Sequence, residues 1–124
     1  MKTLILVFIG GGLGSLLRYI VYRLFRGMDA IAFPYSTFLV NITGCFLIGF
    51  IIFYTERFGN NTIQWRLFLV TGFCGGFTTF STFAYENVML INDHRIFLFL
   101  IYAIGSVTLG ILATYFGIMA ARSI

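Results

Sequence analysis

The sequence has few residues that carry charge or acid–base chemistry. Of its 124 residues only 10% are charged, and it contains one histidine, one proline and two cysteines. No nucleophile stands near a suitable base, which argues against an enzyme. Cys45 and Cys74 lie far apart in apolar segments without histidine or acidic neighbours, so we expect neither a metal site nor a disulfide there. We expect no organic cofactor and no nucleic-acid partner.

Apolar residues make up 60% of the chain instead, in four blocks at 3–22, 33–54, 65–91 and 96–121. Each block reaches the ~20 residues that a helix needs to cross a ~30 Å hydrocarbon layer. The connections at 23–32, 56–64 and 92–95 are too short to hold a catalytic domain. We therefore predict an all-α membrane protein, with four transmembrane helices in one domain over residues 1–124.

We expect this protein to span the lipid bilayer of the plasma (cell inner) membrane several times. Arg18 follows the first glycine-rich stretch where a removable signal peptide would have its cleavage site. The first helix is therefore expected to remain in the protein.

Positive charge is almost equally divided between the two sides of the membrane. One side carries Lys2, Arg57, Arg66 and Arg122, and the other carries Arg23, Arg26 and Arg95, with Arg18 just inside the bilayer. Membrane proteins normally have their excess of lysine and arginine on the cytoplasmic side. Two explanations stay open: a local cluster orients every copy alike, or copies insert both ways and pair as antiparallel dimers. The second would supply an inverted repeat, between which solute sites often form.

Small residues at four-residue spacing predict closely packed helices. The pairs and runs are Gly10 with Gly14, Gly11 with Ser15, and Ser106, Gly110 and Thr114 on the last span. This spacing lets two helix backbones approach each other. We interpret it as the sign of a packed oligomer.

Polar side chains lie inside two of the apolar blocks. Asn41 shares a helix face with Thr37 and Gly44, and its amide is either a partner for another helix or a donor for a permeating anion. On the fourth span, residues at intervals of four form an uncharged stripe, Tyr102, Ser106, Gly110 and Thr114. Such a stripe fits an interhelical seam or a solute path.

The third block contains a second group of unusual residues. It is 27 residues long, and Gly75-Gly76 followed by Phe77-Thr78-Thr79 near its middle predict a broken helix. Carbonyl groups freed by a break can ligate a cation, and in an antiparallel dimer they would meet on the two-fold axis. Beyond the break, Phe80 and Phe83 share a face, and the positive edges of their rings can bind an anion weakly. Ordinary packing of the two rings is the alternative.

Two ionisable residues, Arg18 and Glu86, lie within the apolar blocks. An unpaired charge inside the bilayer is costly, so both are expected to pair, to reach the interface, or to act on ions at a pore mouth. An acid in a membrane helix is also what a proton-coupled exporter needs. Glu86, however, lies toward the end of its span, away from the mid-membrane position of such a relay.

Three stretches together resemble the Fluc (CrcB) family of small fluoride channels. They are GGGLGSLLRY at 10–19, FLVNITG at 38–44 and TGFCGGFTTFSTFAYE at 71–86, in the family's order and spacing. The last stretch is the most specific, and the resemblance covers essentially the whole chain. Two positions depart from the family pattern: Ser36 replaces a usual glycine, and Gly110 replaces a frequent serine in the fourth-span stripe.

The resemblance implies a dual-topology antiparallel homodimer with two fluoride pores, each lined by both subunits. It implies that Phe80 and Phe83 offer ring edges to fluoride, that Asn41 donates from its amide, and that further hydroxyls line the route, at Ser81, Thr82, Ser106 and Thr114. Tyr102 belongs to the same fourth-span stripe. The resemblance also implies a structural Na⁺ ion at the centre of the dimer, held by the backbone carbonyls of Gly75 and Thr78.

The expected activity is the passive export of cytoplasmic fluoride, which reduces its toxicity. No phosphate-binding loop or mid-membrane acid indicates energy coupling. Two alternatives remain: a proton-coupled dual-topology small multidrug exporter that works through Glu86, and a non-transporting subunit of a membrane assembly.

Overall fold

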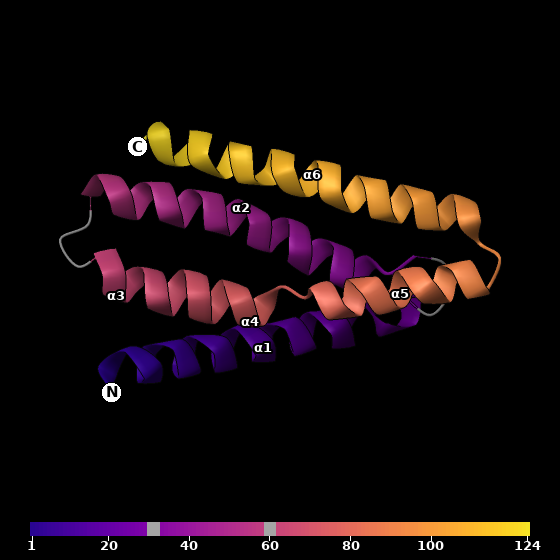
Figure 1. Ribbon diagram of the computed structural model, residues 1–124, viewed down its shortest axis with the longest axis horizontal. Helices are drawn as coiled ribbons and strands as arrows, with labels where there is room; N and C mark the ends of the chain where they lie inside the picture. The colour runs from indigo at the N-terminus through magenta and orange to yellow at the C-terminus, as the bar shows by residue number, and fades with distance from the viewer. Residues whose placement is uncertain (30–32, 59–61) are drawn as a thin grey trace.

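The chain forms four long helical spans that run back and forth. The computed structural model describes residues 1–29, 33–58 and 62–124, and these contain helices and no strand. The helices are α1 (Lys2–Asp29), α2 (Tyr35–Phe58), α3 (Thr62–Arg66), the π-helical segment η1 (Leu67–Cys74), α4 (Gly75–Phe77), α5 (Phe80–Asn92) and α6 (Ile96–Arg122). Both termini lie at one end of the bundle (Figure 1).

Four spans are long and apolar enough to cross a membrane, at Lys2–Asp29, Tyr35–Arg57, Ile63–Asn92 and Ile96–Arg122. The prediction of an all-α protein with four membrane helices and a broken third helix is therefore confirmed. The first connection is shorter than expected, because α1 continues to Asp29. Arg23 and Arg26 consequently lie on the last turns of a helix and not in a loop.

The helices pack as two close pairs, α1 with η1 and α4, and α2 with α6. Glycines make both contacts possible. A methyl group at Gly14 would overlap the carbonyl oxygen of Phe73, and one at Gly117 would overlap that of Phe46. Gly10 and Gly14, whose spacing we interpreted as the sign of a packed oligomer, serve a contact within the chain. The oligomer itself stays a prediction.

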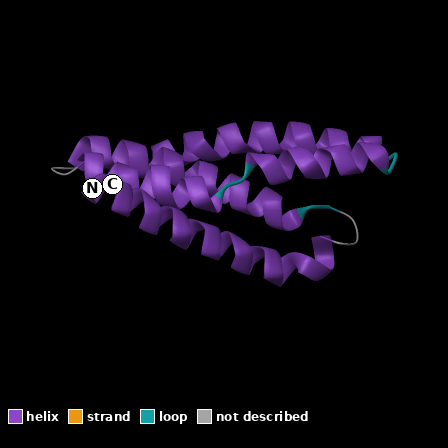
Figure 2. Cartoon of the chain, turned by 60° about the horizontal axis from the view of Figure 1, so that its bottom comes forward, coloured by secondary structure: helices purple, strands orange, loops and turns teal. Residues whose placement is uncertain are grey.

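The break in the third span lies at Thr78 and Thr79, three residues beyond Gly75. Gly75 itself is helical, with φ −63° and ψ −36°. The extended residues are Thr78 (φ −82°, ψ 160°) and Thr79 (φ −151°, ψ 116°), which form the short loop between α4 and α5 (Figure 2). Gly76 has a packing role instead, because a methyl group there would overlap the carbonyl oxygen of Gly11.

The contact between α1 and η1 gives a stability prediction. We expect Gly14→Ala to lower the free energy of unfolding by about 1–3 kcal/mol, because overpacking forces two backbones apart. Gly12→Ala is the matched control, since nothing lies within 4 Å of the methyl group it adds. Thermal unfolding of both purified variants in detergent measures the difference. Equal melting temperatures for the two variants would contradict this account of the seam.

Candidate ion pathway

Asn41 connects α2 to the break in the third span. Its Oδ1 accepts a hydrogen bond from the Thr79 N–H (2.8 Å), and its Nδ2 donates to the Thr79 carbonyl oxygen (3.1 Å). An extended residue inside a membrane helix must find such partners, because hydrocarbon offers none. The second N–H of the Asn41 amide has no acceptor among the described residues.

Hydroxyl groups cap the start of α5. The Thr79 Oγ1 accepts from the backbone N–H of Thr82 (3.3 Å) and donates to the Thr82 Oγ1 (3.0 Å). The Ser81 Oγ lies 3.3 Å from the same Thr79 oxygen. Ser81 and Thr82 are therefore together at the N-terminus of a helix, where the helix dipole favours negative charge.

A groove of about 260 Å³ lies beside the break. Its lining residues come from α2, the break, α5 and α6, and none of them is charged: Asn41, Cys45, Ile48, Thr78, Thr79, Phe80, Phe83, Ser106 and Val107. The ring centroids of Phe80 and Phe83 are 5.8 Å apart. The Ser106 Oγ is buried without a hydrogen-bond partner in the described part of the chain. The groove thus combines phenyl rings with polar donors.

Phe80 is the most open member of this groove, with 79% of its surface exposed. Phe83 is partly covered, and its ring packs edge-to-face against Tyr102 at 5.0 Å between centroids. One chain therefore forms only one wall around Phe80.

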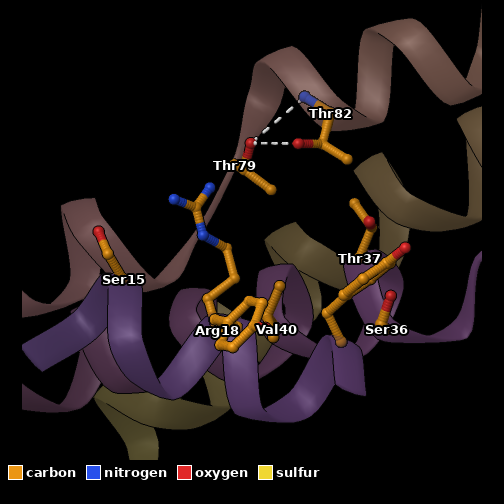
Figure 3. Close-up of a pocket in the computed structure, with 9 residues that line it drawn as sticks. Ser15, Arg18, Ser36, Thr37, Val40, Thr79 and Thr82 are labelled. Atoms are coloured by element: carbon orange, nitrogen blue, oxygen red, sulfur yellow. Dashed lines mark hydrogen bonds between the residues drawn. The ribbon is translucent and has the colours of Figure 1, made fainter. Parts of the chain in front are cut away.

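A second, larger pocket of about 400 Å³ lies toward the end of the bundle that holds the 93–95 turn. Arg18 extends into it from α1, and Ser36, Thr37, Thr79 and Thr82 contribute hydroxyl groups (Figure 3). Ser15, Tyr19, Tyr22 and Val40 complete the lining. Thr79, at the break, is the residue common to this lining and to that of the groove.

Glu86 receives two short hydrogen bonds from other spans. The Thr37 hydroxyl donates to Oε1 (2.7 Å), and the Tyr102 hydroxyl donates to Oε2 (2.7 Å). Tyr102 is fully buried. No ion pair joins Arg18 to Glu86 within the described residues of this chain. Sequence reasoning placed Thr37 on the face of Asn41 but gave no signal that it would bond to Glu86.

The fourth-span stripe is divided among different neighbours. Ser106 lines the groove, whereas the Thr114 hydroxyl donates to the Cys45 and Gly110 carbonyl oxygens at 3.1 Å each. Thr114 lines a separate apolar cavity of about 150 Å³. The structure therefore does not bring Thr114 together with Ser106, Phe80 and Asn41.

Backbone carbonyl groups are exposed at the break. The Gly76 carbonyl oxygen accepts a hydrogen bond from the Ser15 hydroxyl (3.4 Å). The Gly75 and Thr78 carbonyl oxygens receive none from the described residues, because the Thr79 N–H bonds to Asn41 and the Thr82 N–H bonds to the Thr79 hydroxyl. These two oxygens have the chemistry of ligands for a hard cation.

A bundle of four membrane helices with a broken third span and an uncharged polar groove defines a small integral, multi-pass membrane protein. The chain belongs to the CrcB family: residues 5–118 match the family described as CrcB-like protein, Camphor Resistance (CrcB).

Similar proteins cover the chain from end to end. It is 41% identical to the fluoride-specific ion channel FluC of Flavobacterium psychrophilum over 100% of both chains. It is 49% identical to the protein of that name from Phocaeicola vulgatus, over 95% of this chain and 97% of the relative. It is 46% identical to the protein of that name from Chlorobium luteolum, over 97% of this chain and 92% of the relative.

Proposed function

We propose that this protein is a fluoride-selective channel that lets cytoplasmic fluoride leave the cell passively. The observation that carries the proposal is the groove at the break, where an amide, a buried hydroxyl and phenyl rings meet without any charged side chain. Such groups bind an anion weakly enough to release it, as conduction requires. The names of the relatives point to the same ion.

Passive export suits the chemistry of fluoride. Hydrogen fluoride crosses membranes as a neutral acid and dissociates in a near-neutral cytoplasm, which traps the anion. An inside-negative potential drives fluoride out with ~2.3 kcal/mol per charge per 100 mV. Family membership favours this channel over the proton-coupled drug exporter and over an enzyme.

We further propose that the functional unit is an antiparallel homodimer with two pores. Phe80 is exposed in the single chain, and a second copy of opposite orientation would supply the missing wall around it. The carbonyl oxygens of Gly75 and Thr78 would then hold a structural Na⁺ between the subunits. When bound, the ion would neutralise carbonyl dipoles that converge from two chains.

Fluoride efflux from liposomes tests the function. Purified protein is reconstituted into vesicles loaded with fluoride, valinomycin is added to balance charge, and a fluoride electrode follows release. We expect rapid, valinomycin-dependent fluoride loss and no comparable chloride loss in parallel vesicles. Absence of fluoride loss from verified dimers would reject the channel and reopen the exporter, which a pH gradient and Glu86→Gln would then test.

The two-way insertion of the chain gives a separate prediction. A single cysteine introduced at position 60 in Cys45→Ala/Cys74→Ala protein should react with a membrane-impermeant reagent in about half of the copies in intact cells, because the positive charges do not favour one orientation. A cysteine at position 31 should give the same fraction. Complete labelling at one position and none at the other would exclude the antiparallel dimer.

A further inference from the structure

Asp29 and Ser36 form a hydrogen-bonded contact that includes no residue lining the groove. The Ser36 backbone N–H donates to Asp29 Oδ1 (3.1 Å), and the Ser36 hydroxyl donates to Asp29 Oδ2. Asp29 is the last residue of α1, and Ser36 is the second residue of α2. Ser36 is only 4% exposed. The carboxylate therefore ties the end of one membrane helix to the beginning of the next.

This contact acts as a cap on α2. The first N–H groups of a helix have no partner within the helix, and a carboxylate there satisfies them and complements the helix dipole. In α2 the Tyr35 N–H bonds to the Phe33 carbonyl oxygen and the Phe38 N–H to that of Pro34. Among the residues that the structure describes, the Ser36 N–H has one acceptor, Asp29, seven residues earlier.

The capped turn leads directly into the pathway. Thr37, which follows Ser36, donates to Glu86, and Asn41, one turn further along α2, holds both backbone groups of Thr79 at the break. A rotation or slide of the first turn of α2 would move both side chains together, because they project from one rigid helix.

We propose that Asp29 is a positioning residue for conduction. By capping α2 through Ser36 it keeps Thr37 and Asn41 aligned with the third span. This inference rests on the proposed channel function.

The charge of Asp29 must be separated from its hydrogen bonds. Glu86 bonds to Thr37, the residue after Ser36, and Arg18 lines the same pocket as Ser36. Loss of a negative charge near a pore mouth could by itself alter anion entry. Asp29→Asn removes the charge and keeps an acceptor for the Ser36 N–H, whereas Asp29→Ala removes both.

The experiment compares fluoride efflux per folded dimer for the wild type, Asp29→Asn, Asp29→Ala and Asp93→Ala. Asp93 lies in the turn at the same end of the bundle, so its loss removes an equal charge without touching α2. We expect Asp29→Ala to conduct more slowly by up to about fivefold, the factor by which loss of a typical helix cap shifts the equilibrium between aligned and displaced states. Asp29→Asn should remain within twofold of the wild type, and so should Asp93→Ala.

Each result has a defined meaning. Equal efflux for Asp29→Ala and the wild type would overturn the positioning role. Equal slowing by Asp29→Asn and Asp29→Ala would also overturn it, because the effect would then come from the lost charge. Efflux is normalised to dimers recovered by size exclusion, so a variant that only unfolds more easily leaves the rate unchanged. If the wild type itself releases no fluoride, the result rejects the proposed channel function. A wild type that conducts is therefore the condition for testing the role of Asp29.

Discussion

Replacing Phe80 with isoleucine is expected to reduce fluoride efflux by roughly thirtyfold while the folded dimer persists. The phenyl edge carries a partial positive charge that an aliphatic side chain lacks. A cation over the face of a ring, away from water, gains a binding free energy of ~2 kcal/mol, and we expect a similar gain for an anion at the ring edge. Losing ~2 kcal/mol corresponds to a factor of about thirty in rate. Isoleucine keeps much of the apolar bulk, so the groove beside Asn41 and Ser106 stays lined. Efflux from liposomes at equal protein density measures the loss.

Phe97 provides a matched control for this substitution. It is exposed to nearly the same degree as Phe80, 77% against 79%, but it lies near the start of α6 and does not line the groove. Phe97→Ile should therefore leave fluoride efflux close to that of the wild type. If both variants conduct like the wild type, the ring edge has no part in conduction. If both are equally impaired, the loss reflects a general disturbance of exposed aromatic residues.

The sequence was sufficient to predict the bundle because its signals are long and local. Four apolar blocks above the length of a bilayer crossing leave little choice of architecture. The broken third helix was also predictable, and the break lies within the stretch expected for it, residues 75–79. The exact residues were not predictable, because α4 continues through both glycines of this stretch and the chain extends only at Thr78 and Thr79. The decisive partner, Asn41, lies 38 residues away in sequence, and no local pattern reveals such a contact.

Contacts between residues far apart in sequence were also not predictable around the candidate site. Spacing places Thr37 and Tyr102 on suitable faces of their helices, but only the assembled bundle shows that both donate to Glu86. The four-residue stripe on the fourth span predicts one common face. In the structure its members meet different neighbours, because α6 packs along α2 at Thr114 and approaches α5 near Tyr102. Periodicity fixes a face of a helix, and tertiary packing decides what that face meets.

Asn41→Asp is expected to have the second large effect, a loss of fluoride efflux of about two orders of magnitude. The Asn41 amide both accepts from and donates to the Thr79 backbone. An ionised aspartate retains the acceptor but replaces the Nδ2 donor with an oxygen that faces the Thr79 carbonyl oxygen. Removal of one preorganised donor to a charged species in a dry site typically costs about 10²–10³ in rate, and the new negative charge would also repel fluoride.

Two further variants separate the causes of this loss. Asn41→Ala removes both hydrogen bonds without adding charge, so it should loosen the break and lower thermal stability but slow efflux less than Asn41→Asp. Asn92→Asp makes the same amide-to-acid exchange at the exposed end of α5 and should conduct normally. Wild-type efflux from Asn41→Asp dimers would remove this amide from the pathway. Equal slowing in the Ala and Asp variants would instead assign Asn41 to holding the break, with no direct part in binding the anion.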